Sequence, residues 1–340
     1  MTKSSSPTLE DVAKLAGVST ASISRALNEP GKVAEATRKR IEEAIDQLGY
    51  TPNFGGRALA SRRTNTIGAV IPSMANAMFA NGLQAFQEVL ADEGMTLLVA
   101  TTGFDPMEEQ RAIKSLVAQG ADALLLIGNE RPAETWDFID KRNVLHLIAW
   151  CNHTRDGNLF VGFDNAGAAG NAARAAMEMG HRRLAMISGQ THLNDRAKER
   201  QQGVIDAVRA FGQGARLTHV IEAPYLIDEA GDALVEIMGQ AEKPTVVLCA
   251  NDAQAAGAMI KARAMGLNLP RDLSFVGFDD IGLARVVTPA LTTVRVPQVE
   301  MGRGAARLLL DMMAGKSNLS SQTIATELIR RESLVPPLEA

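Results

Sequence analysis

Residues 8–25 read Thr-Leu-Glu-Asp-Val-Ala-Lys-Leu-Ala-Gly-Val-Ser-Thr-Ala-Ser-Ile-Ser-Arg, and this stretch decides how the beginning of the chain folds. Thr8 and Asp11 form the start of a capping box, so a helix is predicted to begin directly after Thr8. Gly17 supplies a tight turn, and Ser19 is a good N-cap for a second helix. Two short helices separated by such a turn are typical of the helix-turn-helix motif.

The second helix is expected to present Thr20, Ala21 and Arg25 outward, where the base edges of a DNA major groove would lie. Arg25 can donate two hydrogen bonds to a guanine, whereas Thr20 and Ala21 offer methyl contacts or one hydroxyl. An ordinary three-helix bundle is the alternative interpretation of this local pattern. The candidate DNA-binding residues here are Thr8, Ser19, Thr20, Ala21, Ser22, Ser24, Arg25 and Asn28.

The distribution of charge favours a polyanionic partner for the first part of the chain only. The net charge of the 340 residues is −4. Residues 1–65 hold ten Lys and Arg against seven Asp and Glu, whereas the remaining 275 hold 25 against 32. Such asymmetry is expected of a small basic region that meets DNA and a larger acidic body that does not.

Beyond residue 65, short apolar runs alternate with amphipathic segments of helix length. Strands are predicted at residues 67–71, 96–100, 123–127, 145–149, 184–187, 246–249 and 273–276. The alternation predicts an α/β fold with a mostly parallel, doubly wound sheet. Because this part of the chain is longer than a single domain built on one open sheet, two similar lobes are expected. Ligands of such sheets bind at the carboxyl ends of the strands, which here means between the lobes.

Several stretches together resemble the lac-repressor/gal-repressor family of transcriptional regulators, over essentially the whole chain. They are residues 8–25, 48–53, 67–72, 164–165, 180–185, 251–252, 276–280 and 291–294. The resemblance implies a helix-turn-helix head at residues 1–52, a hinge linker or helix at 53–65, and an effector-binding and dimerisation core at 66–340. The core would have the two-lobed fold of type I periplasmic binding proteins. Its first lobe would comprise about residues 66–161 and 296–323, and its second lobe about residues 162–293 and 324–340.

The resemblance also assigns a role to the hinge. In the family, a hinge helix inserts a leucine into the minor groove at the centre of the operator, and an apolar wedge of this kind kinks the duplex. The matching residues here make Leu59 the wedge and Arg57 a further DNA contact. Gly55 and Gly56 each cost about 1 kcal/mol in a helix relative to alanine, so we expect this hinge helix to form only on DNA. Packing of Leu59 on a neighbouring lobe is the alternative.

Candidate effector-binding residues lie where predicted strands end. Asp164 follows the strand-like run 161–163, Asn251 follows 246–250 and Asp279 follows 274–278, although each could also cap the next helix. Arg200 matches the family arginine that holds a ligand carboxylate or hydroxyl. The remaining candidates are Asn194, Arg196 and two aromatic stacking walls, Phe79 and Trp150, of which Trp150 could equally be a core residue. Such a pocket suits a sugar, a sugar acid or a nucleobase.

Other classes of protein find little support in the sequence. No apolar stretch is long enough to span a membrane, and no signal peptide is recognisable. Cys151 and Cys249 are expected to be free thiols in a reducing cytoplasm. Residues 315–317, Gly-Lys-Ser, lack the first glycine of a phosphate-binding loop, and neither a dinucleotide-binding nor a hydrolase motif is found. We therefore expect no cofactor and no enzymatic activity.

The sequence thus predicts a cytoplasmic homodimer that binds a pseudo-palindromic double-stranded DNA operator. A small molecule, such as a sugar or sugar acid, would control its affinity for the operator. The regulator would act as a repressor. The alternative is a sugar-binding protein without a role in DNA regulation. The helical head argues against that alternative, because a transport component has no need of one.

Overall fold

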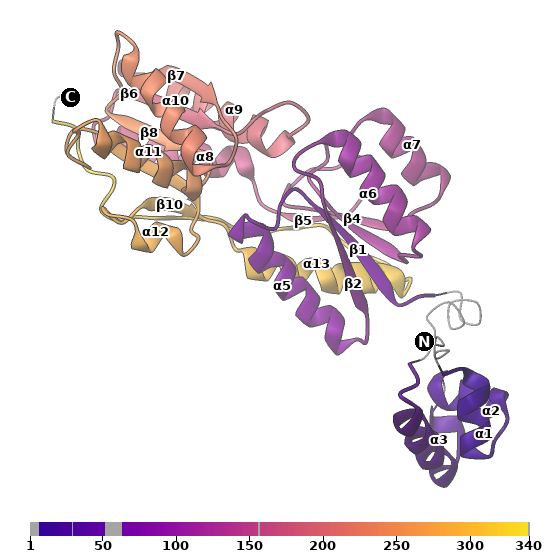
Figure 1. Cartoon of the computed structure of the whole chain (residues 1–340). Helices are drawn as coiled ribbons and strands as arrows, with labels where there is room; N and C mark the ends of the chain where they lie inside the picture. Colours follow the sequence, from indigo (N-terminus) through magenta and orange to yellow (C-terminus); the bar gives the residue numbers. More distant parts are fainter. Residues whose placement is uncertain (1–6, 29, 52–62, 156, 339–340) are drawn as a thin grey trace. The chain divides into compact units, whose positions relative to one another are not determined.

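The computed structural model of the chain describes residues 7–28, 30–51, 63–155 and 157–338. The chain divides into two compact units, residues 1–64 and 65–340 (Figure 1). We call them the N-terminal unit and the core. Every described strand belongs to the core, whereas the described elements of the N-terminal unit are helical.

The described part of the N-terminal unit contains three helices and a 3₁₀ turn: α1 (Leu9–Ala16), α2 (Thr20–Asn28), the turn Pro30–Lys32, and α3 (Glu35–Leu48). The predicted capping box is confirmed, because Thr8 Oγ1 accepts a hydrogen bond from Asp11 N at 3.3 Å and Thr8 N donates to Asp11 Oδ2 at 2.8 Å. Gly17 has a φ of 64° and closes α1, as predicted. The side chain of Ser19 accepts a hydrogen bond from Ser22 N at 3.2 Å. Gly17 and Ser19, which the sequence places at the end of the first helix and the start of the second, therefore have the predicted roles.

A small apolar centre holds these three helices together. Val12 from α1, Ile23 from α2 and Ile41 from α3 are at most 1% exposed. The alanines at 13 and 16 let α1 approach its neighbours closely, because they are small. Apolar side chains alone therefore fill the described centre of this unit.

The core contains two six-stranded sheets, each with the predicted doubly wound α/β pattern (Figure 1). The first has the order β11-β5-β4-β3-β1-β2, and its neighbouring strands are all parallel. Its strands are β1 (Thr66–Ile71), β2 (Thr96–Thr101), β3 (Ala123–Ile127), β4 (His146–Ala149), β5 (Phe160–Gly162) and β11 (Gln322–Thr323). We call this sheet with its helices the first lobe.

The second sheet has the order β12-β10-β9-β8-β6-β7, and only its edge strand β12 is antiparallel. Its strands are β6 (Arg183–Ser188), β7 (Arg216–Glu222), β8 (Val246–Cys249), β9 (Ser274–Asp279), β10 (Thr292–Arg295) and β12 (Glu327–Ile329). This sheet and its helices form the second lobe. All seven strands predicted from the sequence are present in the two sheets.

Helices cover both faces of each sheet, because successive strand residues point to opposite sides. In the first lobe, Leu125 packs towards α5 and α13, whereas Leu124 packs towards α6 and α7. In the second lobe, Met186 belongs to the apolar cluster with α8 and α9, and Ile187 to the one with α10 and α11. The helices are α5 (Ala77–Asp92), α6 (Pro106–Ala118), α7 (Ala133–Lys141), α8 (Asn165–Glu178), α9 (Asp195–Phe211), α10 (Ile227–Gly239), α11 (Asp252–Ala264), α12 (Leu283–Val286) and α13 (Gln298–Met313).

Within residues 63–338 the chain passes between the lobes three times. The passages lie between β5 and α8, between β10 and α13, and between β11 and β12. Each is only a few residues long, so the carboxyl ends of strands from both sheets remain close to one another. Among the described helices, none combines the length and apolar character that crossing a membrane requires.

Candidate DNA-binding surface and ligand cavity

The outer face of α2 carries the predicted DNA-reading residues. Thr20, Ala21 and Arg25 are exposed, whereas Ile23 and Ala26 face the apolar centre of the unit. This division follows from the 3.6-residue period of the helix. The surface that the sequence predicts for base contacts is therefore accessible in the N-terminal unit.

The other candidate DNA-binding residues of the N-terminal unit differ in their exposure and in their hydrogen bonds. Ser19 is exposed, and its hydroxyl lies 3.0 Å from that of Ser22. Thr8 is exposed as well, but its hydroxyl donates to Asp11 Oδ2 at 2.7 Å within the capping box. Ser24 is half-buried on α2. The side chain of Asn28 and the hinge residues Arg57 and Leu59 lie outside the described residues.

A cavity of about 770 Å³ lies in the core, lined from both lobes. Its first-lobe side follows the ends of β1 and β2 and includes Asn76 and Phe104. Its second-lobe side follows the ends of β6 and β8 and includes three predicted residues, Asn194, Arg196 and Asn251. The cavity therefore lies where parallel sheets place their ligands, at the carboxyl ends of strands.

A much smaller inner pocket adjoins this cavity and shares several of its lining residues. Three more predicted residues, Phe79, Arg200 and Asp279, line the inner pocket. Six of the eight predicted effector residues thus lie around one connected site.

Arg200 is the most firmly positioned of these residues. It is 4% exposed, its Nε donates to Asn165 Oδ1 at 2.9 Å, and its Nη1 donates to Ala250 O at 2.7 Å. The guanidinium carbon lies 4.0 Å from the centre of the Phe278 ring. Burial lowers the pKa of Arg200, while the neighbouring Asp279 acts in the opposite direction.

Asp279 shows two features that a purely structural residue would avoid. It is 2% exposed, and its Oδ1 has no hydrogen-bond partner among the described residues. Its φ of 110° lies in a region that favours glycine. Burial raises the pKa of its carboxyl group well above the usual value, although Arg200 opposes this effect. A buried carboxyl group on a strained backbone, with one oxygen lacking a hydrogen-bond partner among the described residues, is a candidate for ligand contact.

Two predicted effector residues are not brought to the site. Asp164 is exposed and caps α8, where its side chain accepts a hydrogen bond from Gly167 N at 2.8 Å. Trp150 is 1% exposed, and its ring packs 5.9 Å from that of Phe79. Neither lines the cavity or the inner pocket. For these two residues the geometry supports the alternative roles, a helix cap and a core side chain.

Sequence reasoning missed an aromatic pair in the site. Phe104 follows β2 in the first lobe and Tyr225 follows β7 in the second, and their ring centres lie 5.3 Å apart. Both also line the inner pocket, so the pair stands between the two spaces. No local signal connects residues so distant in the chain. Tyr225 could have been nominated only if β7 had been predicted.

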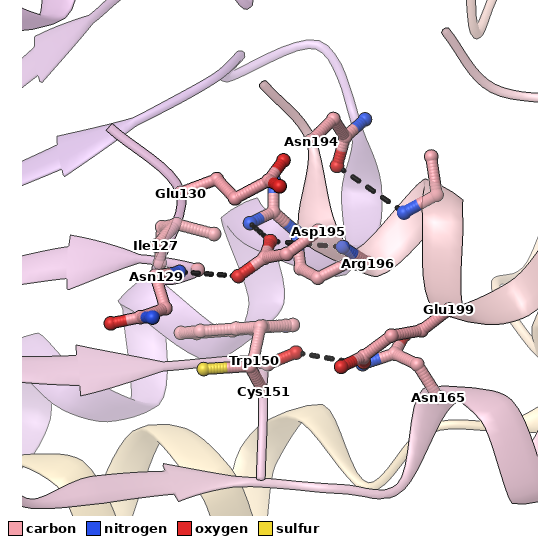
Figure 2. Close-up of polar contacts among 12 residues, drawn as sticks. Ile127, Asn129, Glu130, Trp150, Cys151, Asn165, Asn194, Asp195, Arg196 and Glu199 are labelled. Carbon is pink, nitrogen blue, oxygen red and sulfur yellow. Dashed lines mark hydrogen bonds and ion pairs between the residues drawn. The ribbon is translucent and has the colours of Figure 1, made fainter. Parts of the chain in front are cut away.

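Polar contacts join the lobes beside the cavity (Figure 2). Asp195, at the start of α9, accepts a hydrogen bond from the backbone N of Asn129 in the first lobe and forms an ion pair with Arg196 at 2.9 Å. Burial alone would raise the pKa of Asp195, but Arg196 and the backbone hydrogen bonds outweigh it and lower the pKa. Lys198 Nζ lies 2.6 Å from Glu130 Oε1 of the first lobe. The first turns of α9 therefore hold the lobes together.

A helix-turn-helix unit and a two-lobed core with a cavity lined from both lobes define a class of protein, the DNA-binding regulator that responds to a small ligand. Residues 8–53 match the family model for bacterial regulatory proteins of the lacI family. Residues 173–334 match the model for a periplasmic binding protein-like domain.

Similar proteins extend the match to the whole chain. The transcriptional repressor CytR of Escherichia coli K12 is 32% identical over 328 residues, which are 96% of each chain. The transcriptional regulator GalR of the same strain is 34% identical and covers 98% of this chain and 97% of its own. A solved structure of the regulator CelR with cellobiose is 31% identical, with a TM-score of 0.72 over 96% of this chain and 99% of its own.

The chain belongs to the lacI family. It is a DNA-binding transcriptional regulator with a periplasmic-binding-protein-like core, as its sequence predicts.

Proposed function

We propose that this protein is a transcriptional repressor whose affinity for operator DNA is set by a sugar-like effector in the core cavity. The observation that carries this proposal is the grouping of Arg200, Asp279 and Asn251 around one buried pocket. Arg200 can donate hydrogen bonds and Asp279 can accept them, which suits the hydroxyl groups of a sugar. CytR is named a repressor, and CelR binds cellobiose in its solved structure.

In this proposal the residues Ser19, Thr20, Ala21, Ser22, Ser24, Arg25 and Asn28 contact the operator, and Thr8 orients α1. The hinge at residues 53–65 contributes Arg57 and Leu59 to the minor groove. A homodimer presents two such heads to a pseudo-palindromic site, because two-fold protein symmetry requires two-fold DNA symmetry. This role is one of binding rather than catalysis and belongs in the cytoplasm, with the chromosome.

Effector control follows from the position of the cavity. A ligand that contacts both lobes stabilises the lobe arrangement in which those contacts form. If the two lobe arrangements differ in operator affinity, ligand binding changes the operator affinity. The operator then changes the ligand affinity by the same factor, because the coupling free energy is reciprocal. The three short passages between the lobes allow such a rearrangement without disturbing either sheet.

The test is a gel-shift selection of genomic fragments with the full chain, followed by titration with sugars. We expect specific fragments to be retained by the full chain, lost on deletion of residues 1–64, and released by one sugar. Sugar binding by a chain that retains no fragment would show instead a small-molecule binding protein without regulatory function.

A further inference from the structure

Arg196, which lines the cavity, already has its charge matched by the protein. Its Nη1 lies 2.9 Å from Asp195 Oδ1. A Cβ atom added at Gly128 of the first lobe would lie 1.6 Å from Arg196 Nη1, so the guanidinium group rests against the Gly128 backbone. Arg196 therefore serves the contact between the lobes, and its charge is not free for an anionic ligand.

Three further basic side chains that contact residues of the site are also engaged by the protein. Lys198 pairs with Glu130, and Arg131, whose side chain is fully buried, lies 2.9 Å from Glu109 Oε1. Arg200 is held by two oxygen acceptors and an aromatic ring, and its charge is opposed by Asp279 in the same pocket.

Carboxylates facing the site are less completely engaged. Asp279 Oδ1 in the inner pocket and Glu130 Oε2 at the cavity wall are buried, and neither has a hydrogen-bond partner among the described residues. Asp228 and Glu229, in the first turn of α10, also line the cavity, and no described cation forms an ion pair with either of them. A buried carboxylate oxygen without a donor is unfavourable, so these oxygens are suited to donors brought by a ligand.

We propose that this cavity selects an effector without negative charge, an uncharged sugar or an amino sugar, whose donors reach Asp279 from one lobe and Glu130 from the other. This inference rests on the proposed function, because it concerns the ligand of the same site. A sugar acid or sugar phosphate would place its negative charge beside the carboxylates of Glu130, Asp228 and Glu229, which line the cavity. The sugar acid that the sequence left open is therefore disfavoured.

The test is calorimetric titration of the full chain with matched ligands that differ in charge. The gluco and galacto series each provide a neutral sugar, an amino sugar and a uronic acid, and cellobiose is paired with cellobionate. We expect a neutral or amino member to bind, and its acid counterpart to bind at least about ten-fold more weakly, which corresponds to about 1.4 kcal/mol. Equal or tighter binding of the acid, or failure of every neutral and amino member to bind, would overturn the inference.

Two variants separate the charge of Glu130 from the ion pair that it forms. Glu130→Gln and Lys198→Met both remove the pair between the lobes, but they change the charge of the cavity in opposite directions. The ratio of amino-sugar to uronic-acid affinity should fall about five-fold in Glu130→Gln and rise in Lys198→Met. If this affinity ratio changed in the same direction in both variants, the cause would be the lost contact between the lobes rather than the charge of the cavity. Glu130 would then not be a ligand contact.

Operator binding, measured in parallel, distinguishes this inference from the proposed function. A sugar acid that binds and releases the operator would overturn the charge preference and leave the regulator intact. A neutral sugar that binds without any change in operator affinity would uphold the charge preference and contradict effector control.

Discussion

The N-terminal unit and the core use polar side chains in opposite ways. In the N-terminal unit the described interior is apolar, and the candidate reading residues Thr20 and Arg25 lie on the surface. In the core, Arg200 and Asp279 lie in the interior, where charged groups are rare. Our proposal therefore places the DNA contacts on the exposed face of a helix, and the contacts to a small molecule on side chains in the interior of the core.

In the N-terminal unit, the residues proposed to bind DNA are not those that stabilise the fold. In the core, the residues proposed to bind the effector also contribute to stability. Exposed reading residues can change without affecting the fold, because they contribute little to its packing. Removing a buried charged side chain from the core leaves its buried neighbours without a hydrogen-bond partner, and this destabilises the fold. Substitutions in the two units should therefore differ in both kind and size of effect.

The largest effect is expected for Arg200→Ala. It removes the donor from Asn165 Oδ1 and Ala250 O and leaves a void beside Phe278, which should lower the free energy of unfolding of the core by about 4 kcal/mol. The response to effector should disappear while operator affinity stays nearly intact. Denaturation and gel shift measure the two quantities. Arg209→Ala on the same helix is the control, because its side chain is exposed. An unchanged effector response would remove Arg200 from the site.

Asp252→Asn should change how the stability of the core depends on pH. Asp252 accepts hydrogen bonds from Ile281 N at 2.8 Å and Thr293 Oγ1 at 2.5 Å, yet burial raises its pKa to about 7. The folded chain therefore keeps this proton between about pH 4 and pH 7, where the unfolded chain loses it, so its stabilising contribution is present at low pH and lost as the pH rises through 7.

An asparagine does not titrate but can still accept from Ile281 N and donate to Thr293. Between pH 5 and pH 8 the wild type should lose roughly 3 kcal/mol of stability relative to the variant, at about 1.4 kcal/mol per pH unit. Urea denaturation at the two pH values measures this difference. Parallel curves for the two proteins would contradict the prediction.

Arg25→Ala tests the surface of the N-terminal unit. The operator affinity should fall by about 2 kcal/mol, because a bidentate contact to guanine is lost, while the unfolding free energy changes by less than about 0.5 kcal/mol. Gel shift with specific and random DNA measures the first quantity. Arg111→Ala, an exposed arginine of the core, should leave both unchanged. Equal losses on specific and random DNA would instead make Arg25 a phosphate contact.

The smallest effect is expected for Thr8→Ala. It removes the cap of α1 and should lower the stability of the N-terminal unit by about 1 kcal/mol without changing that of the core. Thr8→Ser keeps the hydroxyl and should be close to wild type. Thermal unfolding of both variants measures the difference. If both variants lost the same stability, the methyl group of Thr8 rather than its cap would be responsible.

The two units also differ in how far their sequence predicts them. The N-terminal unit depends on local signals, so Thr8, Gly17 and Ser19 define its helices without knowledge of the rest. In the core, seven strands were predicted because their apolar runs are continuous, whereas the buried strand β10 (Thr292–Arg295) was not, because it is short and mostly polar in sequence. The edge strand β7 (Arg216–Glu222) was not, because it is half-buried and mixes polar with apolar residues.

The effector site shows the same limit. Arg200 and Asp279, which line the inner pocket, were proposed as site residues from family resemblance and from the end of a strand, and both signals can be read from the chain. Trp150 and Asp164 satisfied the same criteria, but the packing of Trp150 on Phe79 and the cap that Asp164 provides could be seen only in the fold. Tyr225 and Phe104 meet through two loops whose proximity depends on both sheets, and no local pattern encodes that meeting.

The last two strands have a consequence for how the protein is made. β11 (Gln322–Thr323) completes the first sheet beside β5, and β12 (Glu327–Ile329) completes the second beside β10. A nascent chain that has not reached residue 322 therefore has an open edge in both sheets, and such edges invite aggregation. At about 5–20 residues per second, α1 to α3 leave the ribosome well before either lobe can close. Premature termination would thus release a folded N-terminal unit attached to an incomplete core, which cellular proteases would need to remove.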